Sequence, residues 1–322
     1  MSDPLSRLVE NVAELERGWE RRPLVGRSLG GFDDVFGLEH LEALLADTPL
    51  PVSALRLMDG GAGVEAGALA GPRERGGPGA EAVIDPAAAA EALRGGTTLV
   101  FEELQSRIPS VGEFTRGIED ATGYRTYSAA FLTPPGARGA RAHYDMGSVF
   151  MRQVHGSKRW TIGAPEEFPP SRPWNRRRIE PKDPWEVVLH EGDCLYLPRG
   201  YVHVGDATGE ASLHLSIAVE PVTWHDILAE ELAGLAAREP ALREALPFGF
   251  HRMPEPEAAA LLAERTAEAA RTLAGLPAAQ AWRRVVDRHG PAAPAAAPGL
   301  ARALAAARSG EEENTEEEHD ER

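Results

Sequence analysis

Two histidines and one aspartate have the residue types of a mononuclear iron site. His143 and Asp145 are two positions apart, and residues i and i+2 of a β-strand point to the same face, so the pair can bind one metal ion from one side. The candidate third ligand is His203, which ends a segment, residues 192–203, that reads as a strand and a Pro/Gly turn. Two imidazoles and one carboxylate leave positions of Fe(II) open for a chelating cosubstrate and for O₂.

The joint pattern is more informative than either half. A His-x-Asp pair alone is weak evidence in a chain with ten histidines. Here the pair is followed, about 60 residues later, by Gly-Asp-x-Leu-Tyr-x-Pro-x-Gly-x-x-His, and the stretch between them reads as β-structure. The combination predicts a metal site.

The stretch that must position these ligands reads as an all-β domain. Between residues 124 and 222, short apolar runs are separated by Pro/Gly turns, which is typical of a β-barrel or sandwich. The absence of strand–helix–strand alternation argues against a Rossmann-type sheet. Strands are predicted at residues 127–132, 149–155, 159–162, 185–189, 194–197 and 213–219.

Helical periodicity predominates on both sides of this stretch. The N-terminal part is predicted to contain helices at 5–18, 38–46, 86–94 and 111–122, strands at 52–58 and 97–101, and a Gly-rich loop at 60–81. The C-terminal part is predicted to contain helices at 227–237, 257–273, 278–289 and 300–307.

Charge and apolar content exclude several classes of protein. The 322 residues carry 34 basic and 50 acidic side chains, a net charge of −16, whereas a general nucleic-acid binder would show a basic footprint. A hydrophobic content of 43% is too high for a mostly disordered chain. No apolar run reaches the roughly 20 residues of a membrane span, and the N-terminus does not read as a signal peptide. We therefore expect a cytoplasmic protein that binds neither a membrane nor, directly, nucleic acid.

The segment around the predicted ligands resembles the JmjC/cupin-4 family, which includes the ribosomal oxygenases and their bacterial relatives. The resemblance is carried by Leu132-Thr133-Pro134-Pro135-Gly136, His143-Tyr144-Asp145, Gly156-Ser157-Lys158-Arg159-Trp160, the run ending in His203, and Ser212-Leu213-His214-Leu215-Ser216. It covers about residues 15–222. It implies a mainly β core, a double-stranded β-helix (cupin/JmjC jelly roll) with flanking N-terminal helices and a C-terminal α-helical region, and hydroxylation that depends on Fe(II), 2-oxoglutarate and O₂.

The resemblance assigns roles to individual residues. His143, Asp145 and His203 match the iron ligands and would be the catalytic residues. Lys158 matches the basic position that pairs with the distal carboxylate of 2-oxoglutarate, and a lysine ammonium inside a barrel is a suitable partner for a dicarboxylate. His214 matches a histidine that relatives often carry near the cosubstrate. The structural alternative for Lys158 is a solvated residue in a turn, and the alternative for His214 is a hydrogen-bonded histidine in the core.

Two positions depart from the family pattern. Many relatives carry an asparagine and a tyrosine that help to hold 2-oxoglutarate, and the matching residues here are Ala129 and Phe131. We expect Ser128, Thr133 or Ser216 to replace the lost hydrogen bonds.

The loop at residues 172–178 contains four arginines and Trp174. It lies in a segment, residues 138–182, that holds ten basic and four acidic residues, in contrast to the acidic whole. The loop is either solvated and paired with neighbouring glutamates, or a rim that faces the substrate.

We therefore predict a 2-oxoglutarate-dependent dioxygenase that hydroxylates an amino-acid side chain in a protein or peptide, either a ribosomal protein or a peptide natural product. The main alternative, favoured by Ala129 and Phe131, is a catalytically degenerate metal-binding cupin that acts as a binding module. A metal cupin that uses Zn or Ni for non-oxidative chemistry is the third reading.

Three regions are expected along the chain. Residues 1–222 would form the catalytic JmjC/cupin domain with its N-terminal helical extension. Residues 223–308 would form a helical region that makes the protein a homodimer. Residues 309–322 would be a disordered acidic tail, since residues 311–322 hold eight acidic residues and one basic residue.

Overall fold

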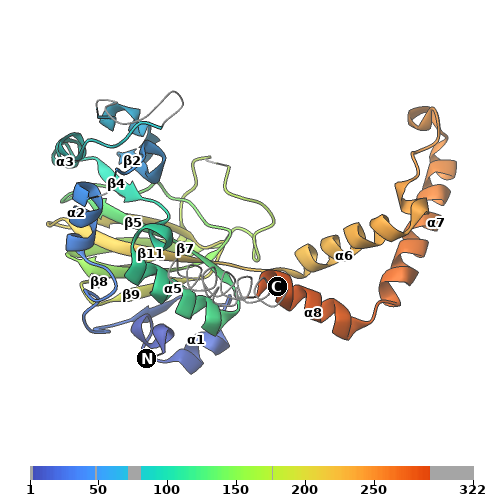
Figure 1. The fold of residues 1–322 in the computed structure, drawn as a ribbon, viewed down its shortest axis with the longest axis horizontal. Coiled ribbons are helices and arrows are strands. Elements are labelled where there is room, and N and C mark those ends of the chain that lie inside the picture. The colour runs from blue at the N-terminus through green and yellow to red at the C-terminus, as the bar shows by residue number, and fades with distance from the viewer. Residues whose placement is uncertain (1–2, 48, 72–80, 176, 291–322) are drawn as a thin grey trace, which may run out of the picture. The chain divides into compact units, whose positions relative to one another are not determined.

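Two facing antiparallel sheets form the centre of the computed structural model, which describes residues 3–47, 49–71, 81–175 and 177–290 (Figure 1). In spatial order, the strands of the larger sheet are β1 (Leu24–Gly26), β9 (Cys194–Leu197), β6 (Ser148–His155), β11 (Ser212–Glu220), β5 (Arg125–Thr133), β4 (Thr98–Phe101), β2 (Leu55–Asp59) and β3 (Ala62–Val64). Those of the smaller sheet are β10 (Val202–Ala207), β7 (Ser157–Ala164) and β8 (Lys182–His190). The strands predicted between residues 124 and 222 are confirmed.

Strand alternation gives the two faces of the larger sheet different surroundings. On β5 and β11, Ala130, Leu215 and Ile217 belong to a buried apolar cluster shared with the N-terminal helices. Their neighbours Ala129 and Ser216 point to the opposite face and line a cavity. A second apolar cluster joins β6 and β9 to β7 and β8, so the smaller sheet packs on that same face. The site therefore lies between the sheets, and the helices cover the back of the larger one.

Short helices of the N-terminal half cover the larger sheet. Three predicted helices are confirmed with small changes in their ends: α2 (Leu38–Asp47), α3 (Pro86–Arg94) and α5 (Pro109–Thr122). A further short helix, α4 (Leu104–Arg107), precedes α5. Residues 52–54 form a 3₁₀ turn before β2, and the predicted loop at 60–81 contains β3 and a 3₁₀ turn at Ala66–Leu69.

The single helix predicted at residues 5–18 is wrong. The chain forms a 3₁₀ turn, η1 (Pro4–Arg7), and a separate helix, α1 (Val12–Gly18). Asn11 stands between them with an extended backbone, and its side-chain oxygen accepts a hydrogen bond from the N–H of Glu14 at 3.1 Å. Asn11 thus caps α1, and a capping residue with extended φ and ψ ends the helical periodicity that the apolar stripe suggested.

Helices follow the last strand, as predicted. They are α6 (Trp224–Arg238), α7 (Glu255–Ala274) and α8 (Ala278–His289). Thr223 begins α6 with a capping box, because its hydroxyl accepts from the N–H of Asp226 and the Asp226 carboxylate accepts from the N–H of Thr223. The helix predicted at 300–307 and the tail at 309–322 lie outside the described residues. In the described part of the chain, no helix has the length and apolar character of a membrane span.

Candidate metal centre and its cavity

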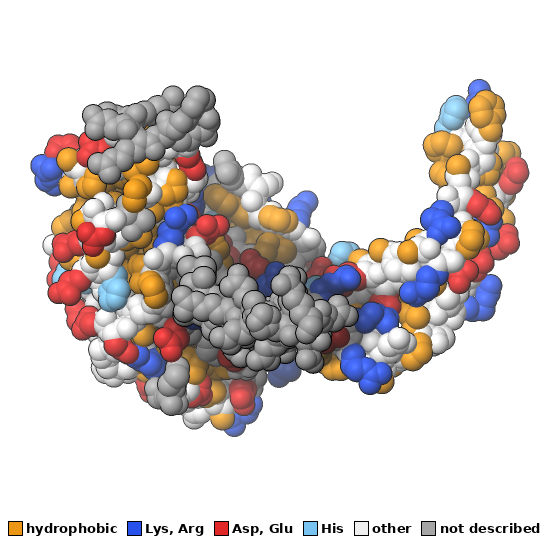
Figure 2. Space-filling model, in the orientation of Figure 1, with side chains coloured by type: hydrophobic (Ala, Val, Ile, Leu, Met, Phe, Trp, Pro, Cys, Tyr) orange, Lys and Arg blue, Asp and Glu red, His pale blue; other side chains and the backbone are white. Residues whose placement is uncertain are grey.

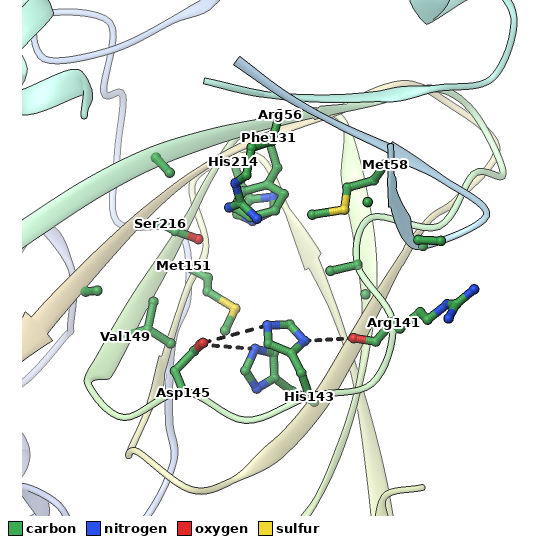
Figure 3. Close-up of a pocket in the computed structure, with 18 of the residues that line it drawn as sticks. Arg56, Met58, Phe131, Arg141, His143, Asp145, Val149, Met151, His214 and Ser216 are labelled. Atoms are coloured by element: carbon green, nitrogen blue, oxygen red, sulfur yellow. Dashed lines mark hydrogen bonds and ion pairs between the residues drawn. The ribbon is translucent and has the colours of Figure 1, made fainter. Parts of the chain in front are cut away.

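His143, Asp145 and His203 converge at one end of the cavity (Figure 3). The Asp145 carboxylate lies between the two imidazoles, with Oδ1 3.8 Å from His143 Nε2 and Oδ2 3.6 Å from His203 Nε2. One ligand atom of each residue lies within 4.8 Å of the others. The structure therefore brings together all three predicted ligands.

The predicted strand that would carry His143 and Asp145 is absent. Both residues lie in the segment between β5 and β6, part of which runs beside β10. The N–H of Gly139 donates to the carbonyl of Gly205 at 3.0 Å, and His143 and His203 exchange two backbone hydrogen bonds of 3.1 and 2.8 Å. The pairing shifts by two residues between these points, so no continuous ladder forms. His143 is positioned by its pairing with β10 rather than by strand alternation.

Hydrogen bonds to the main chain orient both imidazoles. His143 Nδ1 lies 2.7 Å from the carbonyl oxygen of Arg141, and His203 Nδ1 lies 3.0 Å from that of Tyr201. A carbonyl can only accept, so the proton of each neutral ring is on Nδ1 and the Nε2 lone pairs face Asp145. Burial, and after it the neighbouring imidazole of His143, holds the pKa of His203 below its usual value. A metal ligand must be neutral in this way.

The cavity has a volume of about 720 Å³ and opens between the two sheets. Its lining includes the three candidate ligands, Lys158 and His214. In Figure 3, His143 and Asp145 lie on one side of the open space, Phe131 and His214 lie on the other, and Met58 and Met151 extend toward the space between them. This volume accommodates a small dicarboxylate together with a side chain of a second molecule.

Lys158 is a buried cation at this site. Its side chain comes from β7 and is 1% exposed, and Nζ donates one hydrogen bond to Thr133 Oγ1 at 3.0 Å. Nζ also lies 5.4 Å from the ring centroid of Trp160 and 5.8 Å from that of Phe131. Among the described residues no carboxylate forms an ion pair with it. Burial lowers the pKa of Lys158 to about 7, against a smaller opposite effect of Asp206.

Buried polar atoms without partners surround Lys158. His214 is 0% exposed and stacks on Phe131 with ring centroids 4.9 Å apart, yet within the described structure neither of its ring nitrogens has a hydrogen-bond partner. The same holds for Nε1 of Trp160. Burial, followed by the charge of Lys158, keeps the pKa of His214 well below its usual value. An unpaired buried polar group costs about 1–3 kcal/mol, so this end of the cavity is suited to a ligand with oxygen acceptors.

The three hydroxyl residues expected to replace lost hydrogen bonds have different positions. Ser216 lines the cavity beside Ala129, its partner across the β5–β11 pairing. Thr133 Oγ1 accepts a hydrogen bond from the Lys158 ammonium, so it contacts the lysine that would bind the cosubstrate. The expectation for Ser128 is wrong, because strand alternation turns it to the other face of β5, where its hydroxyl donates to Gln105 Oε1 at 2.7 Å.

A group of three polar residues at the cavity wall was not expected from the sequence. Arg56 Nε and the Tyr127 hydroxyl both donate to the buried carboxylate of Glu102, and Arg56 and Tyr127 line the cavity. Burial and Glu102 raise the pKa of Tyr127. Tyr127 could have been found by alternation from Ala129. Arg56 has no sequence signal, because it reaches the site only through the pairing of β2, β4 and β5.

The arginine-rich loop contributes its tryptophan to the site. Trp174 lines the cavity, and its ring centroid lies 5.8 Å from that of His143. Two neighbouring arginines are paired instead: Arg177 with Glu166, and Arg178 with Glu180 at 3.1 Å. Two arginines of the loop are thus paired with glutamates, as the first interpretation expects, and Trp174 lies at the cavity. That the loop faces the substrate stays a prediction.

Comparisons with known proteins agree with this geometry. The family model described as JmjC domain matches residues 108–227. Ribosomal oxygenase 1 of Gallus gallus is 32% identical over 170 residues, which are 51% of this chain and 28% of that protein. The bifunctional lysine-specific demethylase and histidyl-hydroxylase NO66 of Drosophila persimilis is 37% identical over 126 residues, 37% of this chain and 18% of that protein. The match thus spans less than a third of the length of these relatives.

The fold is similar to that of the Escherichia coli ribosomal oxygenase YcfD. One structure of that protein gives a TM-score of 0.55 at 20% identity and covers 90% of this chain and 75% of the other. Another, in complex with cobalt and 2-oxoglutarate, gives 0.55 at 18% identity, with 89% and 74% covered. At this identity the likeness concerns the fold, and it confirms the predicted jelly-roll core with flanking helices.

Proposed function

We propose that the protein is an Fe(II)- and 2-oxoglutarate-dependent dioxygenase that hydroxylates an amino-acid side chain in a protein or peptide, and the match of residues 108–227 to the family model described as JmjC domain supports this. The proposal depends most on one observation: a convergent set of two imidazoles and a carboxylate shares a cavity with the buried cation Lys158. The donor set fits Fe(II), since two imidazole nitrogens and one carboxylate oxygen, from His143, His203 and Asp145, lie within 4.8 Å of one another.

The residues of the cavity can be divided by role. His143, Asp145 and His203 would hold the metal, which when bound activates O₂ at the expense of 2-oxoglutarate. Lys158 would bind the distal carboxylate of the cosubstrate, with His214 and Ser216 as further hydrogen-bonding groups. His203 and Gly205 are two residues apart on β10, a distance of about 7 Å along the strand. The tip of Lys158 lies beside Gly205. The distance from the metal ligand His203 to the Lys158 ammonium therefore suits a short dicarboxylate.

The decisive experiment is succinate formation from 2-oxoglutarate by the Fe(II)-loaded protein, with and without added peptide. Metal-dependent succinate and a gain of one oxygen atom in the peptide would support the enzyme. Bound iron without succinate and without a hydroxylated product would favour the degenerate cupin. Ala129 and Phe131 support that alternative, because they stand where many relatives carry residues that hold 2-oxoglutarate. Metal analysis of protein purified without added metal tests the alternative of a metal cupin that uses Zn or Ni for non-oxidative chemistry.

The substrate is proposed to be a ribosomal protein or a peptide natural product. Relatives named ribosomal oxygenase support the first option. Arg56, Tyr127 and Trp174 line the cavity and would contact the incoming chain. Incubation with host ribosomes, followed by mass spectrometry of the ribosomal proteins, distinguishes the options, because only the first predicts an oxygen atom added to a ribosomal side chain. We also propose a cytoplasmic location and, from the net charge of −16, no direct contact with nucleic acid.

We expect 2-oxoglutarate to bind more weakly as the pH rises above about 7. Burial lowers the pKa of Lys158 to about 7, so the ammonium loses its proton above this pH and no longer attracts a carboxylate. His214, with its pKa held well below the usual value, stays neutral over this range and does not reverse the trend. The dissociation constant should increase by up to about tenfold per pH unit. Calorimetry from pH 6 to 8.5 measures it, and a constant affinity would contradict the role of Lys158.

The helices after residue 222 are proposed to form a homodimer interface and a region separate from the catalytic one. Within residues 224–290, Leu235 is the one apolar residue in the buried core, so these helices lack a core of their own. Nine of the fourteen exposed large apolar side chains of the described structure lie there, and Figure 2 shows apolar side chains along these helices. On α6, three apolar residues follow each other at four-residue spacing and so form one stripe along the helix: Trp224, Leu228 and Leu232. They are 75, 57 and 44% exposed.

A charge within this stripe is expected to dissociate the dimer. Replacing Leu228 and Leu232 by glutamate (L228E, L232E) puts two like charges where two copies of α6 would meet. Light scattering should show a fall from the dimer mass to the monomer mass. Trp185 is also exposed, at 38%, but lies on β8, so Trp185→Glu should leave the mass unchanged. A wild-type protein that is monomeric would overturn the proposal.

A further inference from the structure

Two glycines lie against the buried tip of Lys158. A Cβ atom on Gly139 would stand 2.8 Å from Lys158 Nζ and 3.5 Å from its Cε. A Cβ atom on Gly205 would stand 2.9 Å from Cε and 2.9 Å from the ring of Trp160. Separations below 3.0 Å are essentially never seen for real Cβ atoms. The end of Lys158 therefore occupies the space that a side chain at either position would need.

Backbone freedom does not explain these glycines. Neither Gly139 nor Gly205 has a positive φ, so an alanine could adopt either conformation. Pairing brings both to the lysine: the N–H of Gly139 donates to the carbonyl of Gly205 at 3.0 Å, and in the β10–β7 ladder Gly205 is opposite Trp160 while Ala207 is opposite Lys158. What matters at Gly139 and Gly205 is therefore the absence of a side chain, which leaves room for the tip of Lys158.

The other sides of the ammonium are occupied. Thr133 Oγ1 accepts its hydrogen bond at 3.0 Å, and the rings of Phe131 and Trp160 lie within 6 Å. Lys158 lines the cavity and is 1% exposed. A methyl group added at Gly139 would therefore displace Nζ toward the open cavity, which also contains the metal ligands. To regain an ordinary contact of 3.4–4 Å, Nζ would move by about 0.6–1.2 Å.

We propose that Gly139 and Gly205 determine the length of the dicarboxylate that the site accepts. They are positioning residues, which act by letting the Lys158 ammonium withdraw from the metal ligands far enough for a five-carbon 2-oxo diacid. The displacement expected from one methyl group is similar to the advance of an extended carbon chain per methylene. A side chain at Gly139 should therefore change the preference toward a four-carbon diacid. This inference rests on the proposed function and deepens it.

The test compares two cosubstrates in Gly139→Ala and the wild type. Binding of 2-oxoglutarate and of oxaloacetate to the Fe(II)-loaded full-length protein is measured by calorimetry without O₂, so the readout does not depend on turnover. The affinity of Gly139→Ala for 2-oxoglutarate should fall by about tenfold, and its preference for 2-oxoglutarate over oxaloacetate should fall by at least as much. The affinity for Fe(II) should not change, because His143, Asp145 and His203 retain their contacts.

Gly209 provides the matched control. It follows β10, has no atom within 4 Å of a built Cβ, and has no positive φ, so Gly209→Ala should bind both acids as the wild type does. Gly205→Ala is a second, independent variant, which should show the same change in preference with a larger loss of affinity because its Cβ also meets the Trp160 ring.

The outcomes separate this inference from the function on which it rests. A wild type that binds Fe(II) but not 2-oxoglutarate would overturn both. A wild type that binds 2-oxoglutarate, with Gly139→Ala binding each of the two acids as tightly as the wild type does, would overturn the inference alone. An equal loss for both acids would also overturn it, because Lys158 would then be displaced without any selection for length.

Discussion

Asp145→Ala is expected to abolish Fe(II) binding and 2-oxoglutarate turnover while the protein stays folded. The Asp145 side chain is 43% exposed, and its carboxylate lies within 4 Å of the Nε2 atoms of His143 and His203, so alanine leaves no cavity in the core. It removes the one anionic donor of the three. Loss of a group that merely orients a metal ligand costs 10–100-fold in affinity, so loss of a ligand should cost at least about 100-fold.

Metal titration under anaerobic conditions and a succinate assay measure this effect, and circular dichroism verifies the fold. His155→Ala is the control, because His155 ends β6 with its side chain 53% exposed and does not line the cavity. Turnover that persists in Asp145→Ala at more than a few per cent of the wild type would contradict the assignment of the metal centre.

The second large effect is expected from Lys158→Met. Methionine is an unbranched apolar side chain one atom shorter than lysine, so it keeps most of the stem but removes the charge. A hydrogen bond to a charged group contributes about 1.5–3 kcal/mol. The dissociation constant of 2-oxoglutarate should therefore rise by about 100-fold. Because Lys158 is fully buried without an ion pair in the described structure, the same substitution should stabilise the protein without cosubstrate.

The pH dependence of stability tests the second half of this prediction. The pKa of Lys158 is lowered from 10.5 to about 7 in the folded chain, so between these values the unfolded chain binds a proton that the folded chain does not. The stability of the wild type should therefore rise with pH from about 7 to about 10. The gain from Lys158→Met should be largest below pH 7 and shrink above it, as denaturant titrations would show. A destabilised variant at pH 6 would contradict a buried, unpaired ammonium.

The strands and the ligands were predictable because they depend on local patterns. Apolar runs between Pro/Gly turns marked β5 to β9 and β11, since each of these strands contributes residues to an apolar cluster. His143, Asp145 and His203 were identified by residue type and spacing, which follow from what a metal requires. The break at Asn11 was missed because a capping side chain competes with an apolar stripe that continues on both sides of it.

Ser128 shows where local reasoning fails within a strand. It is adjacent to Ala129 and equally plausible by type, yet the period of two turns it away from the cavity to Gln105. The opposite case is Arg56, whose place in the cavity depends on two strand pairings over more than 70 residues of sequence. No pattern near Arg56 contains that information.

The sequence by itself determined which functional groups are available for the site: two imidazoles, one carboxylate and one lysine, in an order typical of a jelly-roll metal site. It also indicated which stretch would be β and which would be helical. The tertiary structure decided how these groups are arranged. The pairing of residues 137–143 with β10 sets His143 against His203, and the missing side chains of Gly139 and Gly205 leave the space that Lys158 fills. Both depend on contacts between segments distant in sequence, which residue types and local spacing do not specify.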